Sequence, residues 1–347
     1  MARRVRVLVV NAGSSTLKLS VLGEEERPLA ARTLELPGGD IRAADLTAAI
    51  DAMPDADAVG HRVVHGGDAT APERLDPGVR ERLAGLATLA PLHQSRALAG
   101  VDAAGAVRPG MPAVACYDTA FHARLPVAAA TFALPRAWRE RWGLRRYGFH
   151  GLSHAWVARR IGAGARLVSC HLGAGASLAA VLDGRSVDTT MGFTPLDGLV
   201  MATRPGAVDP GLLTWLLTDG GLTLDELDHG LKHHSGLTGL AGTGDMRELL
   251  ARKDPDARLA LDVYVHRLRA GVAAMAAALG GLDVLAFTGG VGEHAAPVRD
   301  RVVAGLAHLG SFATRVVESR EDLEIARQVR SVLAGTLPQP RRGSGER

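Results

Sequence analysis

The sequence predicts an α/β protein made of two related halves with a cleft between them. Three observations support this prediction. A strand, a glycine-containing turn and a return strand near the N-terminus recur about 160 residues later, a third strand ends in a double glycine, and helical patterns separate these units. Repetition of a whole supersecondary unit is typical of a duplicated domain. The length of 347 residues also suggests about two domains.

The first unit begins with the apolar run Val5–Val10, which predicts a buried strand. Small and hydrogen-bonding residues follow at 11–16 (NAGSST), and Leu17–Leu22 predicts a second strand. The whole unit is therefore a hairpin. A Walker A site needs a strand, a loop and then a helix, so a P-loop is excluded here despite the glycine and Lys18.

The second unit repeats this arrangement. Leu167–Cys170 predicts a strand, 171–177 (HLGAGAS) a small-residue turn, and Leu178–Leu182 a return strand. The alignment of the two units pairs Asn11 with His171, Gly13 with Gly173 and Val21 with Val181.

The third unit is the apolar strand Leu282–Thr288, which ends in 289–293 (GGVGE) and precedes a helical stretch from about Pro297 to Leu309. Glycines between a strand and a helix allow a ligand to approach the backbone closely. Further helical patterns cover Ala155–Ile161, Leu212–Leu217 and Asp256–Leu279. The polar segment 338–347 lacks apolar periodicity and is predicted to be a disordered tail.

Composition excludes several classes of function. The 40 basic and 37 acidic residues nearly balance, which favours neither nucleic acid nor an anionic membrane as a partner. Cys116 and Cys170 form no CxxC pair and are predicted to be reduced, buried thiols. Neither a signal peptide nor an apolar run of about 20 residues is recognisable. We therefore expect a cytoplasmic protein.

Nine segments, in this order, resemble those of the acetate/propionate kinase family. They are NAGSSTLKLSV (11–21), GHRVVHGG (60–67), APLHQ (90–94), YDTAFH (117–122), RRYGFHGLSH (145–154), HLGAGAS (171–177), DTTMGFTPLDGLVMATRPG (188–206), SGLTGLAGTGDMR (235–247) and FTGGVGEH (287–294). The resemblance extends from Val7 to about Arg327.

The resemblance implies a duplicated actin-like, ribonuclease H-like fold of two domains with a central cleft. The first domain would comprise residues 1–120, completed by 294–335. The second would comprise 121–293 and carry the nucleotide site. The implied reaction transfers phosphoryl from ATP to acetate, in a homodimer that binds only small molecules.

Phosphoryl transfer depends on charge neutralisation and in-line positioning more than on covalent help from the protein. A carboxylate acceptor is already ionised at neutral pH and needs no catalytic base. The chain offers Arg62 and Arg204 in glycine-containing segments, and a guanidinium binds carboxylate and phosphoryl oxygens at two points. By resemblance, these two arginines hold the acetyl carboxylate and the transferring phosphoryl group.

Three histidines are candidates for donating to the phosphoryl oxygens: His150 by its place in the family motif, and His93 and His171 more weakly. A structural histidine is the alternative for each. By resemblance, Asp118 and Glu293, with Asn11 beside them, would position Mg²⁺ or Mn²⁺, since magnesium takes one or two carboxylates and keeps several waters. The alternatives are a turn residue or helix N-cap at Asp118 and a helix N-terminal charge at Glu293.

The expected phosphate and nucleotide site combines the two turns with two helix starts. Lys18 is one of only three lysines in this arginine-rich chain, which favours a role for the first turn beyond a tight reversal. By resemblance, the site contains Asn11, Ser14, Thr16, Lys18, His171, Gly173, Gly175, Asp245, Met246, Arg247, Gly289, Gly290, Val291 and Gly292.

The expected acceptor pocket is apolar. By resemblance, Val64, Leu92, Phe149 and Pro195 surround the acetate methyl group. Val64 is bulkier than the alanine of propionate-preferring relatives, which favours acetate over propionate.

The sequence departs from the family pattern at Leu152, Ala174, Pro205, Ala207 and His294. Within the same family, propionate is the first alternative acceptor and butyrate the second. The five changes leave GTP or pyrophosphate as alternative donors. They also leave open a weakly active nucleotide-binding sensor. A chaperone-type ATPase is disfavoured because no peptide-binding domain is recognisable.

Overall fold

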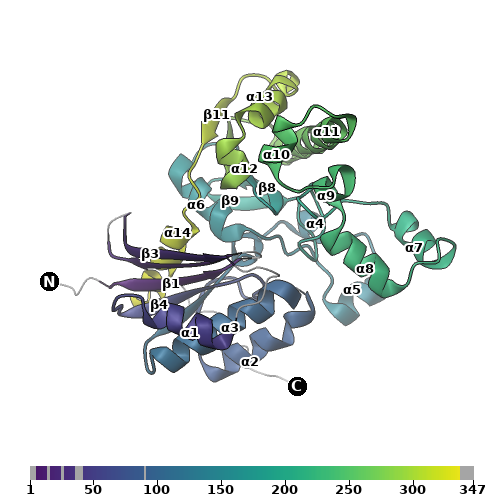
Figure 1. Ribbon diagram of the computed structural model, residues 1–347. Helices are drawn as coiled ribbons and strands as arrows, with labels where there is room; N and C mark the ends of the chain where they lie inside the picture. Colours follow the sequence, from purple (N-terminus) through teal and green to yellow (C-terminus); the bar gives the residue numbers. More distant parts are fainter. Residues whose placement is uncertain (1–4, 14–15, 25–26, 36–41, 90, 337–347) are drawn as a thin grey trace. The chain divides into compact units, whose positions relative to one another are not determined.

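A computed structural model describes residues 5–13, 16–24, 27–35, 42–89 and 91–336. These residues form two compact units, each built on its own sheet (Figure 1). The first unit contains the described residues up to Ala123, then His150–Leu152, and those from Arg320 onward. The second contains Arg124–Phe149 and Ser153–Ser319.

The sheet of the first unit has the strand order β3-β2-β1-β4-β6-β5. Its strands are β1 (Val7–Ala12), β2 (Thr16–Leu22), β3 (Pro28–Glu35), β4 (Ala58–Val63), β5 (Glu73–Arg74) and β6 (Ala113–Tyr117). The strands β1, β2 and β3 pair antiparallel, whereas β4 pairs parallel with both β1 and β6. The predicted hairpin at the start of the chain is confirmed.

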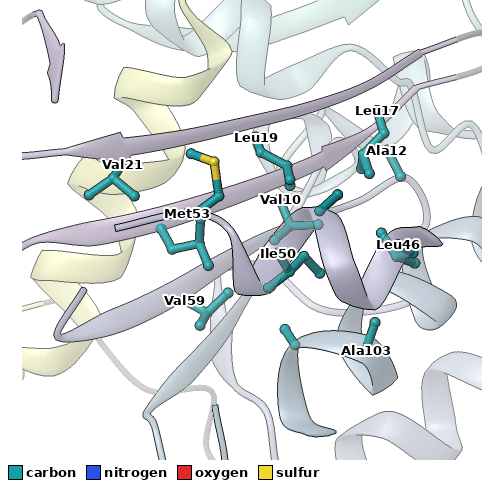
Figure 2. Close-up of a cluster of buried hydrophobic side chains, with 13 residues drawn as sticks. Val10, Ala12, Leu17, Leu19, Val21, Leu46, Ile50, Met53, Val59 and Ala103 are labelled. Carbon is teal, nitrogen blue, oxygen red and sulfur yellow. The ribbon is translucent and has the colours of Figure 1, made fainter. Parts of the chain in front are cut away.

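Helices cover both faces of this sheet. Its helices are α1 (Ala43–Asp51), α2 (Pro77–Gly85), α3 (Pro91–Val107) and α14 (Glu321–Leu333), with 3₁₀ turns at Ala87–Leu89 and Ala120–His122. On one face, Leu46 and Ile50 of α1 pack against β1 and β2, as Figure 2 shows. On the other face, Ile325 and Val329 of α14 pack against β1 and β4. The alternation of side chains along the strands therefore supplies two separate apolar layers.

The sheet of the second unit has the order β11-β10-β7-β8-β9. Its strands are β7 (Leu167–Leu172), β8 (Ala176–Leu182), β9 (Arg185–Thr189), β10 (Val284–Thr288) and β11 (Ala313–Val316). The long helix α11 (Pro255–Leu279) packs against β8 and begins at the N-cap Asp254, with proline at its first position. The remaining elements are α4 (Val127–Ala130), α5 (Arg136–Trp142), α6 (Gly151–Ile161), α7 (Pro210–Thr218), α8 (Leu224–His233), α9 (Gly236–Ala241), α10 (Met246–Ala251), α12 (Gly289–His294), α13 (Ala296–Ala304) and a 3₁₀ turn at Ala307–Leu309.

The two sheets share one topology, which confirms the predicted duplication. The order β9-β8-β7-β10-β11 reproduces β3-β2-β1-β4-β6, with the same antiparallel and parallel pairs. One detail of the predicted alignment is wrong. Leu8 pairs with Val21, whereas the equivalent Val168 pairs with Ala180, so Val21 corresponds to Ala180 and not to Val181. The second turn is one residue shorter: Gly13 N–H donates to Thr16, but Gly173 N–H donates to Gly175.

The C-terminal boundary also differs from the expected one. The sequence places the return to the first domain at 294, but residues 294–319 belong to the second unit. The physical reason is that β11 pairs with β10 and α13 packs against α11. Among the later residues that the structure describes, the segment from Arg320 onward, which contains α14, and the short segment His150–Leu152 belong to the first unit. The predicted disordered tail at 338–347 lies outside the described residues.

His61 is a buried titratable group in the first unit. It lies on β4 with 1% of its surface exposed, and neither ring nitrogen has a hydrogen-bond partner among the described residues. Burial lowers the pKa of His61 to about 4, and the charge of Asp102 opposes this shift only in part. The unfolded chain therefore binds a proton below about pH 6.5, whereas the folded chain binds it only near the lowered pKa.

We predict that acid destabilises the protein through His61. Stability should be fully present above pH 6.5 and fall by about 3 kcal/mol between pH 6.5 and 4 from this group alone. Urea unfolding of wild type and His61→Leu at pH 7.5 and 5 measures the effect. The variant should lose clearly less stability on acidification. Equal losses in both proteins would mean that His61 is not the group that titrates.

Candidate functional site

Arg62 is the centre of a charged cluster in the first unit. The cluster comes from the ends of β1, β4 and β6 and from the first turn of α14. The Arg62 guanidinium donates to the Asp118 carboxylate, with Nη2–Oδ2 at 2.7 Å and Nε–Oδ2 at 3.2 Å. Its Nη1 lies 3.2 Å from Asn11 Oδ1 and 3.3 Å from Glu321 Oε2. Asn11 Nδ2 also donates to Glu321 Oε2, at 2.9 Å.

The cluster is largely withdrawn from water. The side chains of Arg62, Asp118 and Glu321 are 13%, 1% and 11% exposed. Burial alone would lower the pKa of Arg62, but the charges of Asp118 and then Glu321 outweigh it and hold this pKa above its ordinary value. The pKa of Asp118 is raised above its ordinary value: burial and the charge of Glu321 raise it, and the opposing effects of Arg62 and of a backbone hydrogen bond from Leu152 do not cancel them. One arginine thus faces two carboxylates, leaving net negative charge for a cation.

Glu321 was not among the residues predicted from the sequence, where Glu293 was the second carboxylate. In the structure, Glu293 belongs to the second unit, and its Oε1 accepts from the backbone N–H groups of Gly289 and Ser319. These bonds fix the start of α12 and the end of the chain segment after β11. Glu321 lies 203 residues beyond Asp118 in the sequence, and only an acidic first turn of α14 marked it.

His150 follows a bend that brings the chain back to Asp118. Its φ of 55° is left-handed, a conformation that costs a non-glycine residue about 1–3 kcal/mol and is concentrated at functional sites. The next residue, Gly151, lies so close that an added Cβ would be 1.9 Å from the Asp118 carbonyl oxygen. Glycine is therefore required there, and the resulting close approach holds the His150 segment against the cluster.

The other candidates of the first unit vary in exposure. Asn11 lies opposite Lys18 in the β1–β2 register; Asn11 is buried, Thr16 half-buried and Lys18 exposed. His93 is half-buried and Val64 is buried. Ser14 and the side chain of Leu92 lie outside the described residues.

In the second unit, α6 supports the glycine turn through hydrogen bonds. His171 Nδ1 lies 2.8 Å from Ser153 Oγ. His154 joins the two strands of the hairpin: its Nδ1 lies 2.9 Å from Ser169 Oγ on β7, and its Nε2 lies 2.8 Å from Ser177 Oγ on β8. His154 and both of these serines are fully buried. These supporting hydrogen bonds were not predicted from the sequence, although Ser153 and His154 belong to the segment RRYGFHGLSH (145–154).

Arg204 is a half-buried cation beside this turn. Its Nη1 donates to the Pro195 carbonyl oxygen at 2.7 Å, and it has no acidic partner among the described residues. Burial lowers the pKa of Arg204 to about 10. The Ala202 N–H donates to the Ala174 carbonyl oxygen at 3.0 Å, which joins the Arg204 loop to the glycine turn. An anion would supply the charge that this guanidinium lacks.

The predicted nucleotide segments converge on the same turn. Gly289, with φ of 78°, lies so close to Leu172 that an added Cβ would be 2.7 Å from the Leu172 carbonyl oxygen. A Cβ on Gly244, next to Asp245, would be 2.9 Å from the Ala202 Cβ. Residues 289–292 form the first turn of α12 instead of a loop. Within the second unit, the structure therefore brings Gly173, Arg204, Asp245 and Gly289 into one neighbourhood.

Asp245 and Arg247 also have a structural role. Asp245 is the N-cap of α10, and Arg247 donates to its carboxylate, with Nη2–Oδ2 at 2.6 Å. These hydrogen bonds lower the pKa of Asp245 to about 2. Met246 is buried, and the Arg247 side chain is largely exposed. Val291 is half-buried, whereas Phe149 is buried and Pro195 half-buried in the same unit.

The departures from the family pattern leave this framework in place. Ala174 is exposed and uses its carbonyl oxygen to accept from Ala202. Ala207 N–H donates to Gly198, Leu152 belongs to the core of the first unit, and His294 is exposed at the end of α12. Pro205 is half-buried beside Arg204.

The oxygen-rich donor set of the first unit suits magnesium. Asp118, Glu321 and Asn11 supply two carboxylates and one amide around a single arginine, and Mg²⁺ is held by one or two carboxylates plus waters. The described part of the chain has no group of three His, Cys, Asp or Glu side chains that could hold a metal ion. It also has no helix that is long and apolar enough to cross a membrane.

The model of the acetokinase family matches residues 41–324. The chain belongs to the acetokinase family. It is 39% identical over 348 residues to an acetate kinase of Protochlamydia amoebophila, covering 88% of each protein. This assignment confirms the resemblance seen in the sequence.

Two solved structures share the fold. One is a Porphyromonas gingivalis acetate kinase, with a TM-score of 0.86 and 31% identity, covering 95% of this chain and 100% of that one. The other is a Francisella tularensis propionate kinase, with a TM-score of 0.84 and 31% identity, covering 93% and 98%. The duplicated α/β fold class is confirmed by these similarities.

Proposed function

We propose that this protein is an ATP-dependent acetate kinase of the cytoplasm, which converts acetate and ATP reversibly into acetyl phosphate and ADP. The observation that carries the proposal is the Arg62 cluster, in which one arginine, two carboxylates and an amide meet in a chain of the acetokinase family. Such a cluster offers both a cation for an anionic acceptor and oxygen ligands for a magnesium ion.

In the proposed reaction, an acetate oxygen attacks the γ-phosphorus of ATP while the bond to the β–γ bridging oxygen breaks. ADP leaves with the electron pair of that bond, and no proton transfer is needed. Arg62 orients the acceptor carboxylate, and Arg204 neutralises the charge on the transferring phosphoryl group. The absence of a carboxylate partner for Arg204 among the described residues supports this role.

Asp118, Glu321 and Asn11 would hold the magnesium ion that accompanies ATP, and Mn²⁺ would substitute for it. When bound, the ion neutralises the negative charge on the β- and γ-phosphate oxygens. We propose Glu321 in this role in place of Glu293, because Glu321 shares both Arg62 and Asn11 with the cluster, whereas Glu293 binds backbone amides.

His150 is the proposed donor to the phosphoryl oxygens in the transition state, with His93 and His171 as further donors. The left-handed backbone of His150 supports its assignment, because strain of this kind is retained where it serves a site. His171 is oriented through its Nδ1 contact with Ser153, which fixes the ring close to Gly173.

The proposed nucleotide site is the neighbourhood of Gly173 and Gly175. Glycines there and at 289–292 allow the backbone to approach phosphate and ribose closely. Asp245, Met246 and Arg247 would contact the base or the ribose. Asn11, Ser14, Thr16 and Lys18 of the first hairpin are the residues of the first unit proposed to bind phosphate.

A hydroxamate assay for acyl phosphate tests the function. Acetate, propionate and butyrate are supplied with ATP, GTP or pyrophosphate in the presence of Mg²⁺. The proposal requires the highest kcat/KM for acetate with ATP. Binding of ATP without any acyl phosphate would favour the sensor interpretation, and a preference for pyrophosphate would reject the proposed nucleotide site.

A propionate kinase is the second candidate, because one of the solved relatives carries that name. Val64, a buried residue directly after β4, is the proposed determinant of acceptor size. We predict that Val64→Ala shifts the acetate-to-propionate ratio of kcat/KM toward propionate by about tenfold, the lower end of what one methylene provides. Leu98→Ala, a buried change on α3, is the control for general loosening. An unchanged ratio in Val64→Ala would remove Val64 from the pocket.

The protein is also proposed to be a homodimer. Trp138 and Trp142 on α5 and Trp215 on α7 are about half exposed, and aromatic residues are enriched in protein interfaces. Light scattering of the full chain should give twice the mass of one chain. A monomer at micromolar concentration would contradict this assignment.

A further inference from the structure

Three histidines gather at the C-terminal end of α8 in the second unit. His229 and His233 lie on the helix, and His234 directly follows it. The ring centroid of His229 is 4.9 Å from that of His233 and 4.8 Å from that of His234. All three side chains are exposed, so their clustering does not result from packing into a core. Neither the charged cluster of the first unit nor the glycine turn uses any of them.

The closest pair has the geometry of two metal ligands. His229 Nε2 and His234 Nε2 are 3.0 Å apart. With metal–nitrogen bonds of about 2.0–2.1 Å, two ligands at a right angle are roughly 2.9 Å apart and two at a tetrahedral angle roughly 3.3 Å. The observed separation lies between these values. The pair therefore fits one divalent transition ion with little movement of either ring.

We propose that His229 and His234 form a binding site for a divalent transition-metal ion such as Ni²⁺, Cu²⁺ or Zn²⁺. In the ligand-free protein the two Nε2 atoms share a hydrogen bond. When the ion is bound, both imidazoles would carry their proton on Nδ1 and present an Nε2 lone pair to the ion, and water would supply the other ligands. Two protein ligands agree with the lack of any three-residue metal group among the described side chains. Imidazole suits these ions, whereas Mg²⁺ prefers oxygen. Lys232 is the adjacent cation, and its charge is balanced by Asp228 at 2.6 Å.

The site adjoins the Arg204 loop through the backbone. Thr203 Oγ1 donates to the Lys232 carbonyl oxygen at 2.9 Å, and Ser235 N–H donates to the Thr203 carbonyl oxygen at 3.0 Å. A Cβ on Gly236 would lie 2.6 Å from the Arg204 carbonyl oxygen. In the sequence, His234 lies between Lys232 and Ser235, which make these two hydrogen bonds. An ion bound by His229 and His234 therefore fixes the segment that supports Arg204, and we expect its occupancy to alter turnover.

Binding is tested with the tag-free full chain by titration calorimetry with Ni²⁺. Wild type should bind one ion per chain, and His229→Ala and His234→Ala should each weaken binding at least tenfold. His266→Ala, an exposed histidine on α11, is the matched control and should bind like wild type. Copper loading followed by electron paramagnetic resonance should show two coupled nitrogens. Unweakened binding in either His229→Ala or His234→Ala overturns the site, because the geometry needs both rings.

The effect on Arg204 is tested separately and rests on the proposed kinase activity, whereas the binding experiment does not. At saturating Mg²⁺ and ten times the measured Kd of Ni²⁺, kcat/KM for acetate should change by about fivefold or more in wild type, the lower end of typical coupling between sites. His229→Ala should show no such change. An equal change in both proteins would mean that the ion acts elsewhere, for example by replacing Mg²⁺, and would overturn the coupling.

Discussion

Glu321→Gln should lower kcat by about 10²–10³, the loss typical of removing one group that stabilises transition-state charge. The amide keeps the size of the side chain but removes one of the two negative charges that face Arg62. A magnesium ion would then be held by Asp118 as the only carboxylate of the cluster. We expect the apparent affinity for Mg²⁺ to fall as well, so that excess Mg²⁺ or Mn²⁺ restores part of the rate. Initial rates against metal concentration measure both effects.

Glu293→Gln is the matched control, because it makes the same chemical change at the carboxylate that the sequence favoured. In the wild type, Glu293 Oε1 accepts from the N–H groups of Gly289 and Ser319. We therefore expect Glu293→Gln to lower the melting temperature of the protein and to leave the dependence of the rate on Mg²⁺ nearly unchanged. If Glu293→Gln instead showed the large metal-dependent loss and Glu321→Gln did not, Glu293 would be the metal ligand. Circular dichroism of both variants separates misfolding from lost catalysis.

The proposed replacement of Glu293 by Glu321 shows what could not be predicted from the sequence of this protein. Strand, turn and strand patterns are local, so the hairpins at Asn11 and His171 could be predicted from side-chain period and glycine position. The contact between Asn11 and Glu321 joins residues 310 positions apart. It depends on α14 returning to the first sheet, a return that the family resemblance implied but that no local pattern encodes.

Turn length is another property that the sequence left undetermined. Both turns contain glycine and small residues, and an ungapped alignment places Val21 opposite Val181. The registers show that the second turn lacks one residue. The four-residue span from Gly13 to Thr16 and the three-residue span from Gly173 to Gly175 each close with one backbone hydrogen bond. The composition of a turn does not determine whether its closing backbone hydrogen bond spans three or four residues.

The buried hydrogen bonds that support the glycine turn could not be predicted from the sequence either. His154 has the same residue type as the predicted catalytic histidines, and its sequence surroundings are similar. Only the structure shows both ring nitrogens engaged by Ser169 and Ser177 across the hairpin. That arrangement assigns His154 to holding β7 and β8 in register beneath the glycine turn, whereas the left-handed His150 remains the candidate donor.

Arg204→Met should lower kcat by about 10³–10⁵, the contribution of an arginine that neutralises a transferring phosphoryl group. The same change should leave the ligand-free protein as stable as wild type or slightly more stable. Arg204 is a half-buried cation, and its partial burial lowers its pKa to about 10, which corresponds to a cost of up to about 3 kcal/mol. Methionine removes this cost and loses one hydrogen bond to Pro195, worth about 1 kcal/mol. Activity and stability should therefore change in opposite directions.

Steady-state kinetics and urea unfolding of the same preparations measure this opposition. Arg258→Met is the control, because Arg258 is exposed on α11 and its loss should affect neither quantity. Arg204→Lys tests the geometry: it keeps the charge but not the two-pronged guanidinium, so we expect activity between those of wild type and Arg204→Met. If Arg204→Met is destabilised by more than about 1 kcal/mol, the size of one ordinary hydrogen bond, Arg204 stabilises the fold by itself. The Arg204 guanidinium would then not depend on an anionic ligand to balance its charge.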